Sequence, residues 1–164
     1  MERANSVKPR YFGLALGLLV LALDQAAKIA VVRGFESGTL QGGPLLPILD
    51  LALRYNPGVS FSLLRQDSPL GAALLTAFSL TVVAGLSVWM WRARSAWIGV
   101  GVGLIIGGAL GNAVDRAMYG AVVDFLDLHL GERHLFVFNL ADAAISAGVA
   151  LLIVDGLYGE GRKS

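Results

Sequence analysis

Long apolar runs alternate with short polar stretches along this chain, and the runs are of membrane-spanning length. The pattern predicts four transmembrane helices, at about residues 11–32, 69–91, 97–114 and 139–157. A helix needs about 20 apolar residues to cross a bilayer. The first run begins like a cleavable signal peptide, but it is longer than a typical signal core, and Asp24 and Lys28 interrupt it. We therefore expect a retained helix.

A different pattern occupies the first long connection, where apolar and polar residues alternate. Residues 49–55 alternate in this way, and the alternation resumes at Val59, Phe61 and Leu63 after an Asn-Pro-Gly breaker. Period-two patterning on both sides of a turn signal is typical of a hairpin. We therefore expect a small β element within about residues 34–66, lying on the membrane surface or over the helix ends.

Composition narrows the class of protein further. The 164 residues are 55% hydrophobic and only 15% charged, whereas soluble domains need a charged surface. We expect an all-α membrane protein with four transmembrane helices and a small extracytoplasmic β-hairpin or sheet element, forming a single domain over residues 1–164. The absence of cysteine excludes disulfides, thiolate nucleophiles and cysteine metal sites. No basic cluster is interleaved with aromatic residues, so nucleic acid is not an expected partner.

The placement of lysine and arginine predicts the orientation in the membrane. With four spans, one side carries Arg3, Lys8, Arg10, Arg92, Arg94, Arg162 and Lys163. Cytoplasmic loops are enriched in basic residues, so both termini are expected in the cytoplasm. The longer connections, at about residues 33–68 and 115–138, then face outward.

Polar side chains of three predicted helices fall at one depth. Asp24 lies roughly 20 Å along its helix from the cytoplasmic end, and Asn112 roughly 22 Å along its own. Asp142 lies only about 5 Å from the outer edge. All three therefore fall in the outer third of a hydrocarbon core about 30 Å thick. Ionisable groups at such a depth are costly, so they are usually paired or functional.

Helical spacing places further polar groups beside these. The residues that share a face are Asp24 with Lys28, Asn112 with Arg116 and the adjacent Asp115, and Asn139 with Asp142. Each set also has a purely structural interpretation. Asp24 and Lys28 suit an ion pair, Arg116 suits an interfacial anchor, and Asp142 suits a helix start. The common depth favours a shared site.

The connection after the third run supplies a second carboxylate in an apolar setting. Asp124 is flanked by valine, phenylalanine and leucine. Desolvation would raise the pKa of this carboxyl group, and a second carboxyl nearby would raise one of the two further. If Asp124 meets Asp142, the two could share a proton. One would then deprotonate a water and the other would donate to the developing oxyanion, with no metal or cofactor.

Other functions use the same residue types. His129 and His134 with Asp127 and Glu132 suggest a metal site, but their spacing matches no metalloprotease motif, and a solvated polar loop is the alternative. The buried carboxylates would also suit a small ion- or proton-coupled transporter. A third interpretation is a non-catalytic membrane scaffold in which the polar groups lock helices together.

Five short motifs, taken together, are specific to one family. They are DQAAK at residues 24–28, NPGVSF at 56–61, GGALGNAVDR at 107–116, VVDF at 122–125 and FNLAD at 138–142. In these motifs and their order, the chain resembles the bacterial lipoprotein signal peptidases (signal peptidase II), an integral-membrane aspartic protease family.

The resemblance implies a site and a reaction. The family removes the signal peptide from diacylglyceryl-modified prolipoproteins, cutting just before the lipidated cysteine at the outer, periplasmic face of the bacterial cytoplasmic (inner) membrane. Its catalytic aspartates fall on Asp124 and Asp142. Its substrate-binding and supporting positions fall on Asn56, Gly58, Asn112, Arg116, Asn139, Asp24 and Lys28.

The resemblance also implies partners. These are the lipid-modified prolipoprotein, membrane lipids and globomycin-like cyclic peptide inhibitors, which occupy the substrate site. An apolar cleft between helices would take the acyl chains, and Val59 and Phe61 would cover the site. We expect a monomer without a metal or cofactor, and the assignment of base and acid within the dyad stays open.

Overall fold

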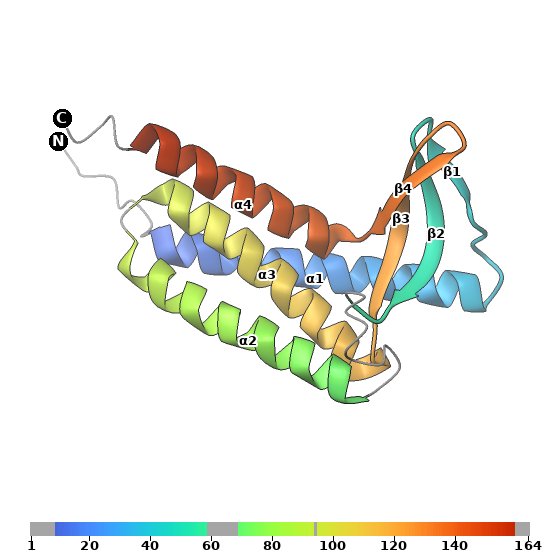
Figure 1. The fold of residues 1–164 in the computed structure, drawn as a ribbon, viewed down its shortest axis with the longest axis horizontal. Helices are drawn as coiled ribbons and strands as arrows, with labels where there is room; N and C mark the ends of the chain where they lie inside the picture. The colour runs from blue at the N-terminus through green and yellow to red at the C-terminus, as the bar shows by residue number, and fades with distance from the viewer. Residues whose placement is uncertain (1–8, 59–68, 94, 160–164) are drawn as a thin grey trace.

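Four helices lie side by side, and a small sheet stands across one end of the bundle (Figure 1). The computed structural model describes residues 9–58, 69–93 and 95–159. The elements in chain order are α1 (Pro9–Glu36), β1 (Gly43–Leu46), β2 (Leu49–Asn56), α2 (Pro69–Arg92), α3 (Ala96–Tyr119), β3 (Val122–Leu130), β4 (Arg133–Phe138) and α4 (Leu140–Gly159). The start of α1 and the end of α4 lie at the end opposite the sheet.

Within the described part of the chain, four helices are long and apolar enough to cross a membrane. The predicted fold class, four membrane helices with a small β element, is confirmed. The third helix continues past the expected end at residue 114 and stops at Gly120. Gly120 adopts a left-handed φ of 72°, and its N–H donates to the Arg116 carbonyl, which is a common way for a helix to end.

Helix α3 forms the centre of the bundle, and glycine lets its neighbours approach closely. A methyl group added at Gly103 would collide with the carbonyl oxygen of Gly13 on α1, and one at Gly108 would collide with that of Ala141 on α4. Small residues at such crossings bring helix backbones together in membrane proteins. The polar side chains of three helices are thereby brought within hydrogen-bonding distance.

The sheet is larger than the pattern predicted. Its order is β1-β2-β3-β4, with all neighbours antiparallel. The predicted strand at residues 49–55 is present as β2, but its neighbours are β1 and β3. The expected second arm, at residues 59–63, lies outside the described residues. Helix α1 also continues to Glu36, so the β element starts later than residue 34, at Gly43.

Strands β3 and β4 occupy a segment in which we predicted only a connection, residues 115–138. The start of β3 conceals its alternation because four successive residues, from Val122 to Phe125, are all buried. A strand covered on both faces shows a continuous apolar run instead of a period of two.

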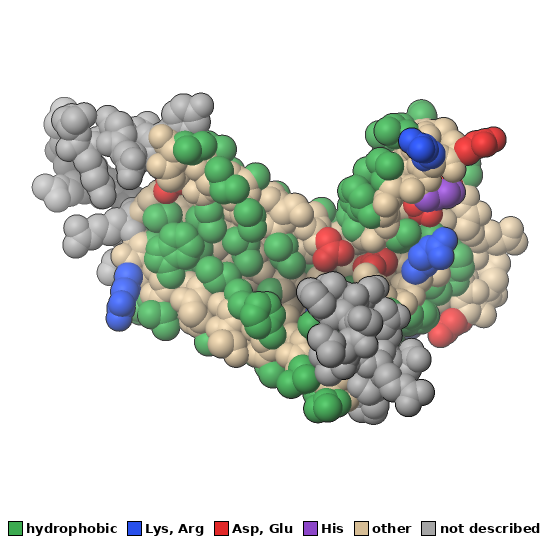
Figure 2. All heavy atoms as spheres, viewed as in Figure 1, with side chains coloured by type: hydrophobic (Ala, Val, Ile, Leu, Met, Phe, Trp, Pro, Cys, Tyr) green, Lys and Arg blue, Asp and Glu red, His purple; other side chains and the backbone are tan. Residues whose placement is uncertain are grey.

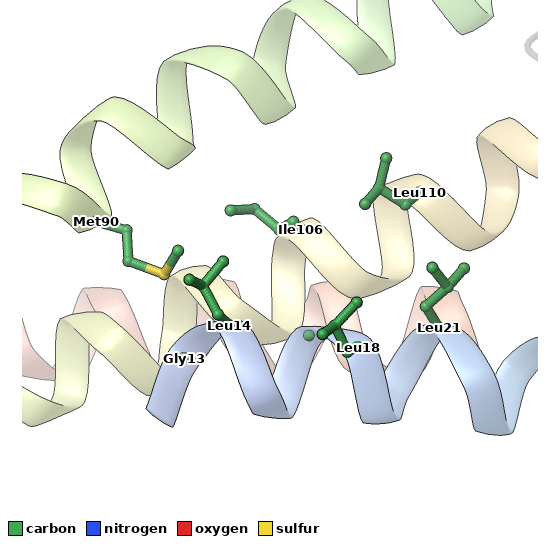
Figure 3. Close-up of a pocket in the computed structure, with 8 residues that line it drawn as sticks. Gly13, Leu14, Leu18, Leu21, Met90, Ile106 and Leu110 are labelled. Carbon is green, nitrogen blue, oxygen red and sulfur yellow. The ribbon is translucent and has the colours of Figure 1, made fainter. Parts of the chain in front are cut away.

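An apolar cavity of about 90 Å³ lies between α1, α2 and α3 (Figure 3). Its lining consists of Gly13, Leu14, Gly17, Leu18, Leu21, Met90, Ile106 and Leu110. None of these residues is ionisable, so the candidate site for acid–base chemistry lies elsewhere.

Candidate active site

Buried polar side chains gather where the sheet-side ends of α1, α3 and α4 meet β3. The members of this cluster are Asp24, Lys28, Asn112, Asp115, Asp124 and Asn139, all at most 7% exposed, together with the half-buried Asp142. The surface is hollowed between the helices and the sheet, and acidic side-chain atoms are visible in the floor of this notch (Figure 2). The structure thus brings together groups that the depth argument placed at one level.

Lys28 is the positive centre of the cluster. Its Nζ lies 2.8 Å from Asp24 Oδ2 and 2.7 Å from Asp115 Oδ2, and it donates to Asn112 Oδ1 at 3.1 Å. An ammonium group has three donors, so each donor has an acceptor. Lys28 is therefore fully engaged inside the protein and ties α1 to α3.

Asp115 was not among the predicted site residues, although its neighbours were. Its carboxylate accepts from Gln25 Nε2 at 2.9 Å and from the backbone N–H of Val123 at 3.0 Å, besides its contact with Lys28. Because Val123 directly precedes Asp124, this contact anchors the start of β3 to α3. Helical spacing could have identified Asp115 as a site residue, because it is three residues after Asn112 and lies on the same side of the helix.

The start of α4 is capped by two carboxylates and one amide oxygen. Asp24 Oδ1 accepts from the backbone N–H of Ala141 at 2.9 Å. Asn139 Oδ1 accepts from the N–H of Asp142 at 2.9 Å, and Asp142 Oδ2 accepts from the N–H of Asn139 at 3.3 Å. This reciprocal pair is a capping box, and acceptors are favourable there because the first N–H groups of a helix lack partners.

Asn139 joins the two aspartates of the predicted dyad. Its Nδ2 donates to Asp124 Oδ1 at 2.7 Å, while its backbone holds Asp142. A second asparagine supports each carboxyl group: Asn56 Nδ2 donates to Asp124 Oδ2 at 3.0 Å, and Asn112 Nδ2 donates to Asp142 Oδ1 at 2.8 Å. Three asparagines thus orient both carboxyl groups around one notch.

The two carboxyl groups differ in their surroundings. Asp124 is 2% exposed, whereas Asp142 is half-buried. Burial raises the pKa of Asp124 above its usual value, the hydrogen bond from Asn56 opposes this, and the negative charge of Asp142 raises it further. A carboxyl group with a raised pKa holds its proton at a higher pH, which suits a pair that shares one proton.

Arg116 and Gly58 lie at the edge of the same region. Arg116 Nη1 donates to the Asn112 carbonyl at 3.4 Å, and its buried Nε has no hydrogen-bond partner among the described residues. Gly58 donates its N–H to Asn56 Oδ1 at 3.0 Å and has a φ of 107°. A side chain would be strained at this φ, so glycine preserves the turn that presents Asn56.

A groove of about 560 Å³ adjoins Arg116 between α2 and α3. Besides Arg116, its lining is mostly small: Ala72, Ala73, Thr76, Ala77, Leu80, Ala117 and Gly120. The groove therefore combines one cation with a largely apolar wall.

Of the residues weighed as a metal site, His134 pairs with Asp127, whereas His129 pairs with Asp50, which the sequence did not suggest. His129 Nε2 lies 3.1 Å from Asp50 Oδ1, and His134 Nδ1 lies 2.9 Å from Asp127 Oδ2. Within the described ranges, no group of three or more His, Cys, Asp or Glu side chains is arranged to hold a metal ion. Each histidine is accounted for by one carboxylate, and neither belongs to the polar cluster.

Comparison with known proteins identifies the family. Residues 16–158 match the family model described as signal peptidase (SPase) II. The lipoprotein signal peptidase of Methylorubrum extorquens (strain PA1) is 52% identical over 145 residues, covering 88% of this chain and 85% of that protein. The lipoprotein signal peptidase of Beijerinckia indica is 45% identical, covering 94% and 92%.

The fold is also that of a solved protein. A bacterial membrane enzyme superposes with a TM-score of 0.76 at 22% identity, covering 94% of this chain and 92% of the other. This match supports the fold described above. The family match and the four apolar helices support a multi-pass membrane protein. By the extent of the family match and the identity to its members, this chain belongs to the signal peptidase II family.

Proposed function

We propose that this chain is an aspartic endopeptidase that removes the signal peptide from diacylglyceryl-modified prolipoproteins, cutting before the lipidated cysteine. Its membership of the signal peptidase II family supports the substrate class. The observation that carries the mechanism is the bridge through Asn139, which holds Asp124 and Asp142 around one notch.

In this mechanism the two carboxyl groups hold one proton and one water between them. The ionised carboxylate takes a proton from the water, and the hydroxide forms a bond to the peptide carbonyl carbon. The protonated carboxyl group donates its proton to the carbonyl oxygen as negative charge develops. As the tetrahedral species collapses, the carboxyl group that took the proton from the water passes it to the amide nitrogen. The carboxylate that had donated takes back a proton from one hydroxyl group, the C–N bond breaks and the amine leaves, so the dyad again holds one proton. Because coupled carboxyls titrate as a pair, either one can begin as the base.

The remaining polar residues hold this arrangement and the substrate. Asn112 and Asn139 orient the carboxyl groups. Asn56 and Arg116 contact the substrate main chain, which gives an acceptor to Arg116 Nε, an atom that has no partner among the residues that the structure describes. The other supporting residues of the proposal are Gly58, Asp24 and Lys28.

The groove beside Arg116 suits the lipid part of the substrate. Its small apolar residues leave room for acyl chains between α2 and α3, next to the cluster. Globomycin-like cyclic peptides would compete for the same region. The expectation that Val59 and Phe61 cover the site stays a prediction, since both lie outside the described residues. We propose that residues 1–164 form one domain and that the protein acts as a monomer.

The proposed location follows from the positive-inside argument. The chain would lie in the bacterial inner membrane with both termini in the cytoplasm and the sheet at the periplasmic face. The start of α1 and the end of α4 lie together at the end opposite the sheet, which is consistent with this orientation (Figure 1).

The decisive experiment replaces either aspartate by its neutral amide. We expect Asp124→Asn and Asp142→Asn to lower cleavage of a purified lipidated precursor by about 10²- to 10⁴-fold, the usual contribution of a general acid or base. The matched control is Asp127→Asn, because Asp127 is a buried aspartate of the same strand that pairs with His134 outside the cluster. Cleavage is followed by a gel shift, and folding by the thermal unfolding midpoint in detergent.

The outcomes separate the three candidate functions. A folded protein without cleavage supports the dyad, whereas retained cleavage by either variant refutes it. A non-catalytic scaffold would lose stability and show no cleavage even in the unaltered protein. A transporter would show ion flux across sealed vesicles that the same substitutions abolish.

A further inference from the structure

At the end of the bundle opposite the sheet, Arg10 of α1 contacts two aromatic rings but no acceptor. The central carbon of its guanidinium lies 5.1 Å from the centre of the Tyr11 ring and 5.2 Å from that of the Trp91 ring on α2. Its Nε is buried without a hydrogen-bond partner, and the ion pairs of the described residues do not include Arg10. Because a buried N–H without an acceptor is costly, an acceptor from outside the chain would stabilise this side chain.

The surroundings of Arg10 favour an anion. Arg92, the last residue of α2, directly follows Trp91 and adds a second positive charge. Within the described ranges, the acidic residue at this end is Asp155 of α4, whose carboxylate accepts from Ser95 Oγ at 3.2 Å. Exposed tyrosine and tryptophan beside arginine are typical of the membrane–water boundary. A planar guanidinium at that level matches the oxygens of a phosphate group.

The apolar cavity described above begins one helical turn beyond this guanidinium. Leu14, Leu18 and Leu21 follow Arg10 at spacings of three or four residues, so they lie on the same side of α1, and all three line the cavity. On α2, Met90 lines the cavity and directly precedes the tryptophan that contacts Arg10. Figure 3 shows Met90 at the end of the cavity where α1 starts, with the leucines leading away from it. The cationic group and the cavity are therefore parts of one continuous surface.

The cavity opens toward lipid. Leu18, one of its lining residues, is 66% exposed, and none of the membrane window of α2 is buried within the protein. Apolar cavities exclude water and accept apolar ligands. In a membrane, the apolar ligand that surrounds these helices is the acyl chain.

The dimensions also fit a lipid. From Arg10 to Leu21 the helix rises roughly 16 Å, and one leaflet contributes about 15 Å, half of the hydrocarbon core. A phosphate at Arg10 therefore places an acyl chain of ordinary length alongside the leucines.

We propose that Arg10 and the cavity form a binding site for one anionic phospholipid of the leaflet at this end of the bundle. The phosphate binds the guanidinium, and one acyl chain fills the cavity between α1, α2 and α3. Helix α2 packs mainly against α3 and touches α1 at few points, so the lipid would join α2 to α1. The proposal does not depend on the peptidase chemistry, because the polar cluster lies toward the other end of the bundle.

The test is native mass spectrometry of the full-length protein in detergent, which counts bound lipids during titration with phosphatidylglycerol. Arg10→Gln removes the charge, and its matched control is Arg33→Gln, an exposed cation near the other end of the same helix. Leu18→Phe places a larger side chain at the mouth of the cavity. Its matched control is Leu19→Phe, because Leu19 is 53% exposed but does not line the cavity. The melting temperature without lipid verifies that each variant is folded.

We expect the first phosphatidylglycerol to bind about 5-fold more weakly to Arg10→Gln, the usual effect of one basic side chain near an anionic surface. Leu18→Phe should weaken the same binding step, and both controls should bind as the unaltered protein does. Phosphatidylcholine should bind more weakly than phosphatidylglycerol, and Arg10→Gln should lose this preference.

Three results would each overturn the proposal. Equal binding by Arg10→Gln and Arg33→Gln would show non-specific lipid around the helices. Displacement of the lipid by inorganic phosphate would assign Arg10 to a free anion, and unchanged binding by Leu18→Phe would leave the acyl chain outside the cavity. If Arg10→Gln proves unfolded, the phosphate competition and Leu18→Phe still decide the question. Cleavage is not measured, so failure here leaves the proposed peptidase function unaffected.

Discussion

Single residues of the site serve structure and chemistry together. Asp142 completes the capping box of α4 and is also half of the proposed dyad. The same hydrogen bonds that start the helix therefore fix the direction of a carboxyl group of the proposed dyad. Asn139 has the corresponding double role, since it caps α4 through Oδ1 and binds Asp124 through Nδ2.

Lys28 is expected to be the most costly single residue to remove from the cluster. Lys28→Met leaves Asp24 and Asp115 buried without their cation, and breaking a buried pair in this way costs about 3–5 kcal/mol. The measurement is the free energy of unfolding in detergent. Arg33→Met is the control, because Arg33 is an exposed cation of the same helix. Equal stability of the two variants would show that the buried ammonium is dispensable.

Asn56 is expected to control the pH dependence of cleavage. Its hydrogen bond holds down the pKa of Asp124, which burial raises. Asn56→Ala removes that donor, so the pKa of Asp124 rises further and the proton shared by the dyad is lost at a higher pH. The alkaline limb of the kcat/KM profile should therefore move to higher pH.

The comparison for Asn56→Ala is Glu132→Gln, which removes an exposed charge at the tip of the sheet and should leave both limbs in place. A limb that stays fixed in Asn56→Ala, or moves to lower pH, would contradict the assigned role of this hydrogen bond.

Among the elements, α3 contributes most to the assembly of the polar cluster. It supplies Asn112 and Asp115, and its glycine face brings α1 and α4 close enough for their side chains to reach these residues. A wider helix separation would leave Lys28 without two of its three acceptors.

Gly103→Ala should therefore destabilise the bundle. The added methyl group would collide with backbone of Gly13, and overpacking of this kind typically costs about 1–3 kcal/mol. Gly85→Ala is the matched control, because a methyl group at Gly85 meets nothing within 4 Å. Alanine has a higher helix propensity than glycine by up to about 1 kcal/mol, so this control should unfold at an equal or higher temperature. A normal melting temperature for Gly103→Ala would contradict the close crossing.

At the scale of the whole molecule, the orientation of the bundle in the membrane determines the compartment into which the notch opens. The sheet and the polar cluster share one end, and the start of α1 and the end of α4 share the other (Figure 1). If the positive-inside rule holds, the notch opens outside the cytoplasm, where exported precursors arrive.

This orientation is measurable because the chain has no cysteine of its own. In intact spheroplasts, Glu132→Cys in the turn between β3 and β4 should react with a membrane-impermeant maleimide. Ala93→Cys, between α2 and α3, should react only after permeabilisation. The reverse pattern would place the sheet in the cytoplasm and refute the proposed location.

Much of this architecture could be predicted without coordinates. Four apolar runs of membrane length predicted four helices, because a bilayer imposes a minimum length on any span. The rise per residue of a helix placed Asp24, Asn112 and Asp142 at one depth, and the structure joins their helices through hydrogen bonds. The pairing of Lys28 with Asp24 also followed from spacing alone.

Contacts between segments distant in sequence were decided only by the tertiary structure. Val122 and Val123 lie on opposite faces of β3 and are both buried, so the strand lacks the alternation of apolar and polar residues that would have revealed it. Three contacts depend on how helices and sheet pack: the hydrogen bond that the Val123 N–H donates to Asp115, the capping of α4 by Asp24, and the Asn139 bridge between Asp124 and Asp142. The sequence by itself determined which residues are polar, which segments form helices and how far along its helix each polar group lies, because these follow from local period and rise. Which acceptor each donor finds depends on the approach of separate elements, and the glycine crossings of α3 set that approach.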